Sequence, residues 1–230
     1  MQDLYSDFHS IFSVDCVIFG FDKGELKILL IERGEEPYMD YLALPGNIVG
    51  EDEDLDAAAG RVLNELTGLN NIYMEQLHTF GEVGRHPQGR IITVAYFSLI
   101  KVKRHELYPK IPFAKKAEWR TFHDLPKLAF DHSIILEKAY RKLQRKLRYE
   151  PIGFELLPDK FTLTQLQQLY EVILEKEIDK RNFRKKILSY GLLTESGEKQ
   201  KNVSHRAARL YRFNKRRYNS LRKIGFNFEI

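Results

Sequence analysis

Residues 43–69 read ALPGNIVGEDEDLDAAAGRVLNELTGL, and this stretch decides the fold of the N-terminal part of the chain. Pro45 and Gly46 favour a turn, an acidic run follows, and apolar residues then recur at the spacing of one helix face. The pattern predicts a helix over about residues 55–66, which Gly68 can end because glycine adopts the left-handed conformation without strain. The apolar stripe consists of Leu55, Ala58, Val62, Leu63 and Leu66.

The segment 47–69 resembles the Nudix box, a motif of Mg²⁺-dependent hydrolases that cleave diphosphates. In that motif three carboxylates at positions i, i+3 and i+4 share one helix face and hold the metal against the substrate. The corresponding residues here are Val62, Glu65 and Leu66, and the first glycine of the box is Asn47. Because one carboxylate is left of the three, we expect no catalytic residue, no metal site and no cofactor.

The box also contains an arginine and an upstream glutamate. In the family that the motif resembles, this arginine is largely structural, so we predict that Arg61 and Glu53 form an ion pair that supports the fold. The alternative interpretation is an ordinary loop and amphipathic helix, since short motifs also match by chance.

Length and composition exclude several classes of protein. The 230 residues are 43% hydrophobic, which is ample for one or two packed cores. The single cysteine, Cys16, excludes a disulfide framework and lies in an apolar run, where a buried thiol is expected. The N-terminus does not resemble a signal peptide, and no apolar run approaches the length of a membrane span. We therefore expect a soluble, cytoplasmic protein with no membrane partner.

The charge of the chain is unevenly distributed. The net charge is +5, but residues 151–230 contain 17 Lys and Arg against 9 Asp and Glu, a local net charge of +8. This leaves a net charge of −3 for residues 1–150. Such asymmetry indicates a nucleic-acid-binding module joined to a neutral or acidic one.

The N-terminal part of the chain contains both strand and helix signals. A helix is expected over about residues 134–147, with Asp131 or Ser133 as its N-cap. Residues 22–25 have the composition of a hairpin turn. Strands are expected at 13–21, 26–32, 72–83, 91–102 and near 117–120. This mixed α/β order fits a three-layer α/β/α sandwich.

Beyond residues 148–153 the pattern changes to helix signals, and we place a domain boundary at residue 150. Apolar spacing predicts a helix over residues 161–174, capped by Thr162 or Thr164, and a second helix at 179–188 that begins at Asp179. In the second helix Phe183, Ile187 and Leu188 are expected to face the core. Two helices joined by a short turn, the second rich in cations, indicate a helix-turn-helix.

Two short strand signals, at residues 192–194 and 208–213, flank the polar stretch 195–206. This order predicts a winged helix, in which the second helix enters the major groove and the wing contacts the DNA backbone. Arg181 and Asn182, early in the second helix, are expected to read bases. The full set of expected DNA-binding residues is Thr164, Lys180, Arg181, Asn182, Arg184, Lys185, His205, Arg206 and Arg209.

Two alternatives to DNA binding are open at this point. Surface lysines and arginines often form only a solvated face. RNA binding is the second alternative, but the aromatic residues Tyr170, Phe183, Tyr211 and Phe213 occupy core-like positions rather than an exposed stacking platform.

A degenerate Nudix domain at 1–150 followed by a winged helix at 151–230 resembles the Nudix-related transcriptional regulators of the NrtR family. The resemblance covers essentially the whole chain, and it is carried most specifically by residues 44–46, 52–58, 128–132, 179–184 and 207–213. It implies a homodimeric repressor or activator that binds double-stranded operator DNA. It also implies a small-molecule effector, ADP-ribose-like in some branches and a sugar in others.

The effector class is inferred from the missing carboxylates. Because Val62 and Leu66 cannot support metal-assisted diphosphate recognition, we expect a phosphate-free effector, a pentose sugar such as arabinose, and control of carbohydrate metabolism. The alternatives are an ADP-ribose-responsive regulator of NAD synthesis and a Nudix hydrolase acting on ADP-ribose or a related nucleoside diphosphate. A module that only binds other proteins is a further alternative.

In the Nudix fold that this chain resembles, the pocket lies in the cleft between the box helix and the neighbouring strands. Asp15 is the strongest candidate, because a lone acid inside an apolar strand is unusual unless it binds something. A buried acid that bonds only to backbone is the alternative role for Asp15. His132 is expected to fix local structure. The expected effector-binding residues are Asp15, Glu32, Arg33, Asn47, Glu65, Arg85 and Gln88.

Overall fold

The computed structural model describes residues 11–102, 107–201 and 207–230. The chain forms two compact units. The first contains most of the residues up to Tyr140, and the second contains Arg141 onward together with the short segments 20–26 and 99–102. The division falls inside a continuous helix, α2 (His132–Tyr149), so a domain boundary at residue 150 stays a prediction.

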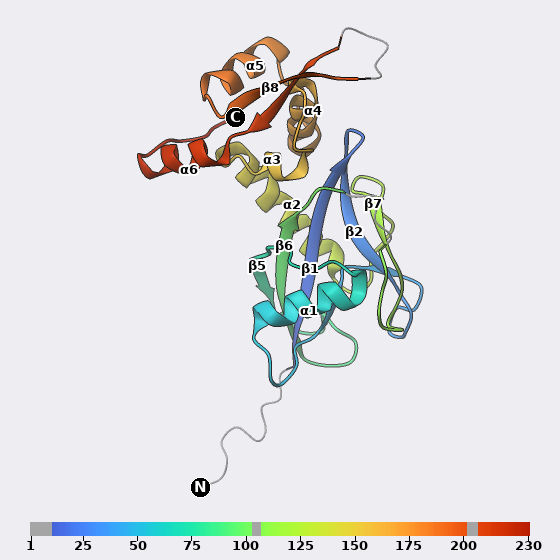
Figure 1. Ribbon diagram of the computed structural model, residues 1–230. Helices are drawn as coiled ribbons and strands as arrows, with labels where there is room; N and C mark the ends of the chain where they lie inside the picture. Colours follow the sequence, from blue (N-terminus) through green and yellow to red (C-terminus); the bar gives the residue numbers. More distant parts are fainter. Residues whose placement is uncertain (1–10, 103–106, 202–206) are drawn as a thin grey trace. The chain divides into compact units, whose positions relative to one another are not determined.

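The first unit is built on a mixed sheet with helices on both faces, as Figure 1 shows. The path of hydrogen-bonded strands runs β3-β2-β1-β6-β5, with β4 paired to β1 and β7 paired to β2. Helix α1 crosses one face and α2 begins behind the other. The strands are β1 (Ile11–Asp22), β2 (Glu25–Arg33), β3 (Leu42–Ala43), β4 (Gly46–Ile48), β5 (Glu75–Phe80), β6 (Ile91–Leu99) and β7 (Ala114–Thr121).

The central strand β1 is buried continuously from Val14 to Gly20. Helices cover both faces of the sheet there, which explains why this strand is apolar along its length rather than alternating. The turn to β2 has positive φ at Lys23 (51°) and Gly24 (81°), which is the backbone of a tight hairpin. The predicted hairpin is therefore confirmed.

The box helix is also confirmed, as α1 (Leu55–Thr67). Its N-cap is Asp54, whose carboxylate accepts from the backbone N–H of Ala57 at 2.8 Å. Gly68 ends the helix with φ 80° and donates its N–H to the Asn64 carbonyl. The start of α2 differs from expectation, because the Asp131 carboxylate bonds to Arg85 instead of capping the helix.

The second unit contains the predicted helix-turn-helix and wing. Thr162 and Gln165 form a capping box at the start of α4, and Asp179 caps α5 by accepting from Asn182 N–H at 2.8 Å. The elements are α3 (Gly153–Leu156), α4 (Leu163–Leu174), α5 (Lys180–Ser189), β8 (Leu193–Lys199), β9 (Arg209–Phe213) and α6 (Lys215–Lys223).

Three features of this unit differ from expectation. Phe183 and Ile187 are buried, but Leu188 is 46% exposed, so its expected place in the core is wrong. Strand β8 continues to Lys199 through a stretch expected to be a loop, because an exposed two-stranded ribbon needs no apolar alternation. Helices α3 and α6 were not expected. Within the described residues, no helix is long and apolar enough to cross a membrane.

Candidate effector pocket and nucleic-acid interface

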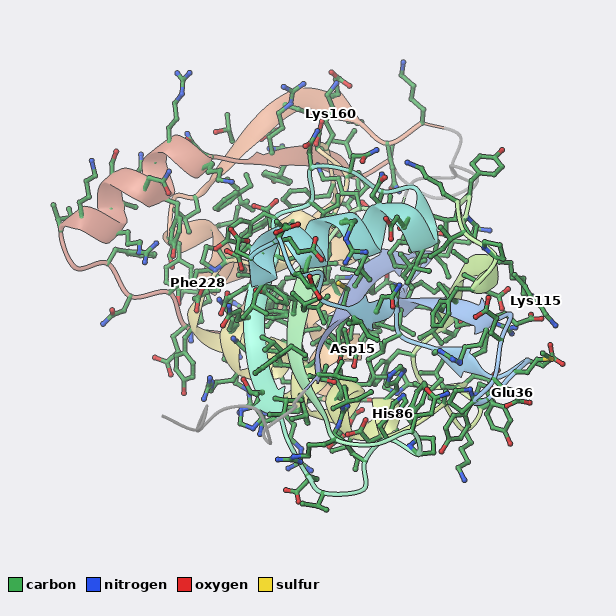
Figure 2. The ribbon with its side chains drawn as sticks, turned by 90° about the horizontal axis from the view of Figure 1, so that it is seen from below. Asp15, Glu36, His86, Lys115, Lys160 and Phe228 are labelled. Atoms are coloured by element: carbon green, nitrogen blue, oxygen red, sulfur yellow. The ribbon has the colours of Figure 1, made fainter. Side chains whose placement is uncertain are left out.

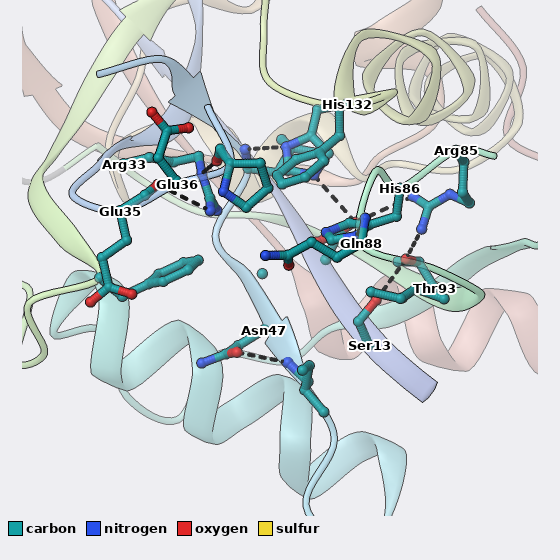
Figure 3. Close-up of a pocket in the computed structure, with 18 residues that line it drawn as sticks. Ser13, Arg33, Glu35, Glu36, Asn47, Arg85, His86, Gln88, Thr93 and His132 are labelled. Carbon is teal, nitrogen blue, oxygen red and sulfur yellow. Dashed lines mark hydrogen bonds and ion pairs between the residues drawn. The ribbon is translucent and has the colours of Figure 1, made fainter. Parts of the chain in front are cut away.

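A cavity of about 300 Å³ lies in the first unit (Figure 3). Its walls come from β1, β4, β6, the end of β2, the loops that follow β2 and precede β6, and the start of α2. Five of the seven expected effector-binding residues line it: Asp15, Arg33, Asn47, Arg85 and Gln88. The sequence therefore placed most of its candidates around one cavity, and their binding role stays a prediction.

Glu32 and Glu65 do not line this cavity, which corrects their expected position. Successive side chains of a strand point to opposite faces, so Glu32 cannot share the cavity with its neighbour Arg33. Glu32 instead lies 3.3 Å from Lys116 Nζ. The Glu65 carboxylate accepts from Arg61 Nη1 at 3.0 Å. The cavity is lined by strands and loops rather than by the box helix.

Other lining residues were missed by the sequence analysis. They come from separate segments that no local pattern connects, although Ser13 lies two residues before Asp15 on the same strand face and His86 adjoins Arg85. The missed polar and aromatic residues are Ser13, Glu35, Glu36, His86, Thr93, Phe113, Phe130 and His132.

Asp15 lies inside the domain, whereas Glu36 and Lys115 lie at its periphery (Figure 2). Asp15 is 5% exposed, and Gly46 makes room for it, since a Cβ there would come within 1.8 Å of Asp15 Oδ1. Its nearest charged or titratable neighbours are His132 Nε2 at 3.6 Å and Arg85 Nη2 at 4.0 Å from Oδ2. Burial raises the pKa of Asp15 to about 7. The carboxylate is thus desolvated and faces the cavity.

Arg85 joins the loop before β6 to the start of α2. Its Nε and Nη2 donate to the two oxygens of Asp131 at 2.8 and 2.6 Å, a bidentate pair. Its Nη1 donates to Thr93 Oγ1, and Thr93 shares a 2.7 Å hydrogen bond with Ser13. The Arg85 side chain is 5% exposed. This network fixes a guanidinium on the cavity wall.

A second guanidinium, that of Arg33, lies between two aromatic rings. Its Cζ is 4.5 Å from the centre of Phe113 and 4.9 Å from that of Phe130, while Nε donates to the Pro37 carbonyl at 2.8 Å. The His86 ring stacks on Phe130 with centroids 4.7 Å apart. Burial lowers the pKa of both Arg33 and His86. Cationic and aromatic groups therefore meet at one side of the cavity.

His132 has the structural role expected of it. Its Nδ1 accepts from the backbone N–H of Leu44 at 2.9 Å, so the ring proton is on Nε2, toward Asp15. Burial lowers the pKa of His132 to about 3, and the ring is neutral at physiological pH. The imidazole joins α2 to the strand that precedes the Pro45 turn.

Asp15→Asn is expected to stabilise the ligand-free protein more at about pH 8 than at about pH 5. The folded pKa is raised from 3.8 to about 7, so the wild-type free energy of unfolding falls as pH rises through that window. Asparagine does not ionise, so the variant does not lose stability in this way as the pH rises. His132, Arg85, Arg33 and Asp131 face Asp15 in both proteins, so the difference between them isolates the carboxylate.

Thermal denaturation at the two pH values checks this prediction. The control is Asp124→Asn, at an exposed carboxylate in the same unit. Equal melting-temperature differences for Asp15→Asn at both pH values would contradict a raised pKa at this site.

The box itself is held together by the predicted ion pair. Arg61 donates to both carboxylate oxygens of Glu53, at 2.9 and 2.5 Å, and the Glu53 carboxylate also accepts from Gly50 N–H at 2.7 Å. The hydrogen bonds from Arg61 are the main reason that the pKa of Glu53 falls to about 2. Val62 and Leu66 are both fully buried. With Glu53 and Glu65 both held by Arg61, the residues at the box positions do not fit a Mg²⁺ site.

The expected DNA-binding residues of α5 lie on its solvent side. Lys180, Arg181, Asn182 and Lys185 are exposed. Arg184 is half-buried, and its Nη2 donates to Thr164 Oγ1 at 3.0 Å across the helix-turn-helix, which joins these two candidates. The structure therefore leaves most of the candidate side chains of α5 accessible.

The wing supplies the remaining candidates. Arg209 is exposed on β9 and donates to the Glu195 carboxylate of β8 at 3.1 Å. Arg209, Thr164 and Arg184 line one hollow on this unit. His205 and Arg206 lie outside the described residues. DNA contact by each of the nine expected residues stays a prediction.

Comparison with known proteins gives matches over both units. The family model of the NUDIX domain matches residues 10–143, and that of the NrtR DNA-binding winged helix domain matches residues 153–213. The ADPR responsive transcriptional repressor NtrR of Acinetobacter baylyi is 39% identical over 97% of this chain and 88% of its own length.

Solved structures agree with these matches. Shewanella oneidensis NrtR complexed with a 27mer DNA has a TM-score of 0.77 and 32% identity, covering 94% of this chain and 97% of that chain. The NUDIX domain of the same protein complexed with ADP ribose has a TM-score of 0.56 and 31% identity, covering 62% and 94%. Because the matches join a Nudix domain to a winged helix over nearly the whole chain, the protein belongs to the NrtR family of Nudix-related transcriptional regulators.

Proposed function

We propose that this protein is an ADP-ribose-responsive transcriptional repressor. Its winged helix binds operator DNA, and its Nudix domain binds ADP-ribose without hydrolysing it. The comparisons give no support to the sugar effector expected from the sequence. They favour the alternative, because the relative in Acinetobacter is named as ADPR responsive and a similar Nudix domain has been crystallised with ADP ribose.

The observation that carries the proposal within the molecule is the pair of buried guanidiniums that line one cavity. Arg33 and Arg85 are cations of the kind that recognise phosphate oxygens in a desolvated site. Asp15 has no hydrogen-bond donor within 3.5 Å among the contacts of the described residues, so it can accept from the hydroxyls of a ribose. The rings of Phe130 and His86 offer a stacking surface for a base.

The loss of the box carboxylates bears on hydrolysis rather than on binding. Diphosphate hydrolysis in the Nudix family uses a metal held by carboxylates, and Val62 and Leu66 supply no oxygen. Phosphate recognition by arginine needs no metal. A domain can therefore lose turnover and keep affinity for the substrate of its ancestors.

The regulator is proposed to act as a homodimer. Two winged helices then bind paired half-sites, and the effector favours one arrangement of the pair over the other. An effector shifts such an equilibrium only if it binds the two arrangements with different affinity, and a coupling of about 1–3 kcal/mol is ordinary.

The test uses the full chain and duplexes that it selects from a random-sequence pool. ADP-ribose is expected to raise the melting temperature and to change the affinity for the selected duplex, since a ligand at 100 times its Kd stabilises by about 2.7 kcal/mol. Arabinose, ribose 5-phosphate and AMP are the comparison ligands. Stabilisation by arabinose and not by ADP-ribose would overturn the effector assignment.

A hydrolysis assay separates the regulator from the enzyme alternative. The chain is incubated with ADP-ribose and Mg²⁺, and AMP release is followed by chromatography. No turnover is expected. Turnover that Glu65→Gln abolishes would establish a working hydrolase, because Glu65 is the carboxylate kept from the trio of the box.

A further inference from the structure

Helix α6 follows the second strand of the wing and lies beyond the residues that match the winged-helix family model. Its sequence, KRRYNSLRK, contains five cations and no acidic residue. Its packing residues are the half-buried Tyr218, whose ring lies 6.0 Å from that of Phe213, and the half-buried Leu221. Arg216 and Lys223 lie on the opposite face, Lys215 and Arg222 lie beside the packing face, and all four are exposed.

Helix α6 is anchored to the end of α5, the proposed recognition helix. The backbone N–H of Asn214 donates to the Leu192 carbonyl at 2.8 Å, and the Asn214 side chain caps α6 by accepting from Arg217 N–H at 2.9 Å. The Arg217 guanidinium packs against Gly191, where a Cβ would come within 2.9 Å of Nη2. Gly191 follows the C-cap of α5. Helix α6 is therefore positioned by the end of the recognition helix and the start of the wing.

The residues after α6 add a second anchor. The Tyr190 hydroxyl donates to the Glu229 carbonyl, and the Tyr190 ring contacts Phe226 edge-on. Phe228 is 3% exposed and also packs on Tyr190. Since Tyr190 is the C-cap of α5, both ends of the segment 214–230 are fixed to the same part of the DNA-binding unit. Figure 1 shows α6 continuing outward from the end of β9.

The exposed charges of α6 are largely uncompensated. Lys215 lies 3.4 Å from Glu155, while Arg216, Arg222 and Lys223 have no carboxylate within 4.0 Å among the described residues. An anchored helix with three such exposed cations, in the unit that contains the recognition helix, fits the phosphate backbone of a duplex by charge complementarity.

We propose that the outer face of α6 binds the phosphate backbone of duplex DNA, as an extension of the winged-helix contact. This inference rests on the proposed function, because it requires that the unit binds DNA. The contact is independent of base sequence: it raises affinity for operator and non-operator DNA alike, and it makes binding steeper in salt.

The test compares the wild-type chain with the triple variant Arg216→Gln, Arg222→Gln, Lys223→Gln. The matched control removes three exposed cations elsewhere, in Lys23→Gln, Lys127→Gln, Arg145→Gln, so the total charge of the two triple variants is equal. Fluorescence anisotropy measures binding to a selected duplex and to a random-sequence duplex over a range of KCl concentrations. Circular dichroism and melting temperature show that each variant is folded.

The α6 variant is expected to bind both duplexes roughly tenfold more weakly, with the slope of log affinity against log salt reduced by about 2 to 3. An affinity and slope equal to those of the matched control would overturn the inference and leave α6 to an acidic protein partner. If the wild-type chain binds neither duplex, the proposed function fails as well; wild-type binding with an unchanged slope in the variant overturns the α6 contact alone.

Discussion

Arg181→Ala is expected to lower the affinity for the operator by about 10- to 100-fold, which corresponds to the loss of one base contact worth about 1–3 kcal/mol. Arg181 is exposed in the first turn of α5, away from the buried Phe183 and Ile187. Recognition helices of this type present their first residues to the major groove. Affinity for non-operator DNA is expected to fall much less, because that binding depends on phosphates.

Arg184→Ala is the companion variant, and Lys186→Ala is the control. Arg184 donates to Thr164, so its loss removes a link between α4 and α5 as well as a charge. Lys186 is exposed on the same helix, but successive residues turn by about 100°, which places it off the face of Arg181 and Lys185. Competition binding with fluorescent duplexes provides the measurement. Unchanged operator affinity in both arginine variants would rule out α5 as the recognition helix.

The parts of the fold that the sequence predicted are those with local signals. Gly68 at the end of α1, and Thr162 and Asp179 at the starts of α4 and α5, cap helices through contacts within a few residues. Such contacts can be identified from spacing alone. Helix α6 was missed because its cations outnumber its apolar residues, which leaves little apolar stripe to detect.

The cavity could be predicted only in part, because it is assembled from distant segments. Asp15 was identifiable as an acid in an apolar strand. Phe113 and His86 were not, because nothing in the sequence shows that residues near 113 and 86 meet those near 33. The prediction that Glu32 lines the cavity was wrong for a simpler reason. Side chains alternate along β2, so only one of the two neighbours Glu32 and Arg33 can face the cavity.

The prediction of a sugar effector, which the comparisons do not support, depended on a different kind of reasoning. It took the loss of metal ligands at Val62 and Leu66 as a loss of phosphate recognition. In the structure those positions belong to the buried side of α1, whereas the guanidiniums of Arg33 and Arg85 lie on the wall of a separate cavity. The metal-ligand positions of the box and the two guanidiniums are therefore different residues, and loss of the first does not imply loss of the second.

Arg85→Met is expected to have the largest effect of any single change in the first unit. It leaves the Asp131 carboxylate, 15% exposed, without its bidentate partner and removes the nearest cation from Asp15. Removing one partner of a buried ion pair lowers the free energy of unfolding by about 3–5 kcal/mol. Chemical denaturation is expected to show this loss, and ADP-ribose is expected to lose its stabilising effect.

The double variant Arg85→Met, Asp131→Asn separates the two consequences. Replacing the unpaired Asp131 carboxylate is expected to recover part of the stability without recovering ADP-ribose binding. The reason is that the free-energy effects of two substitutions in one hydrogen-bond network do not simply add. Arg85→Lys keeps a charge but not the planar fork, and it is expected to fold and bind ADP-ribose at least about tenfold more weakly. Arg90→Met, at an exposed arginine of the same loop, is the control. If Arg85→Lys and the double variant both bind ADP-ribose as the wild type does, the guanidinium serves only to hold α2 against the sheet, and the effector is recognised elsewhere in the cavity.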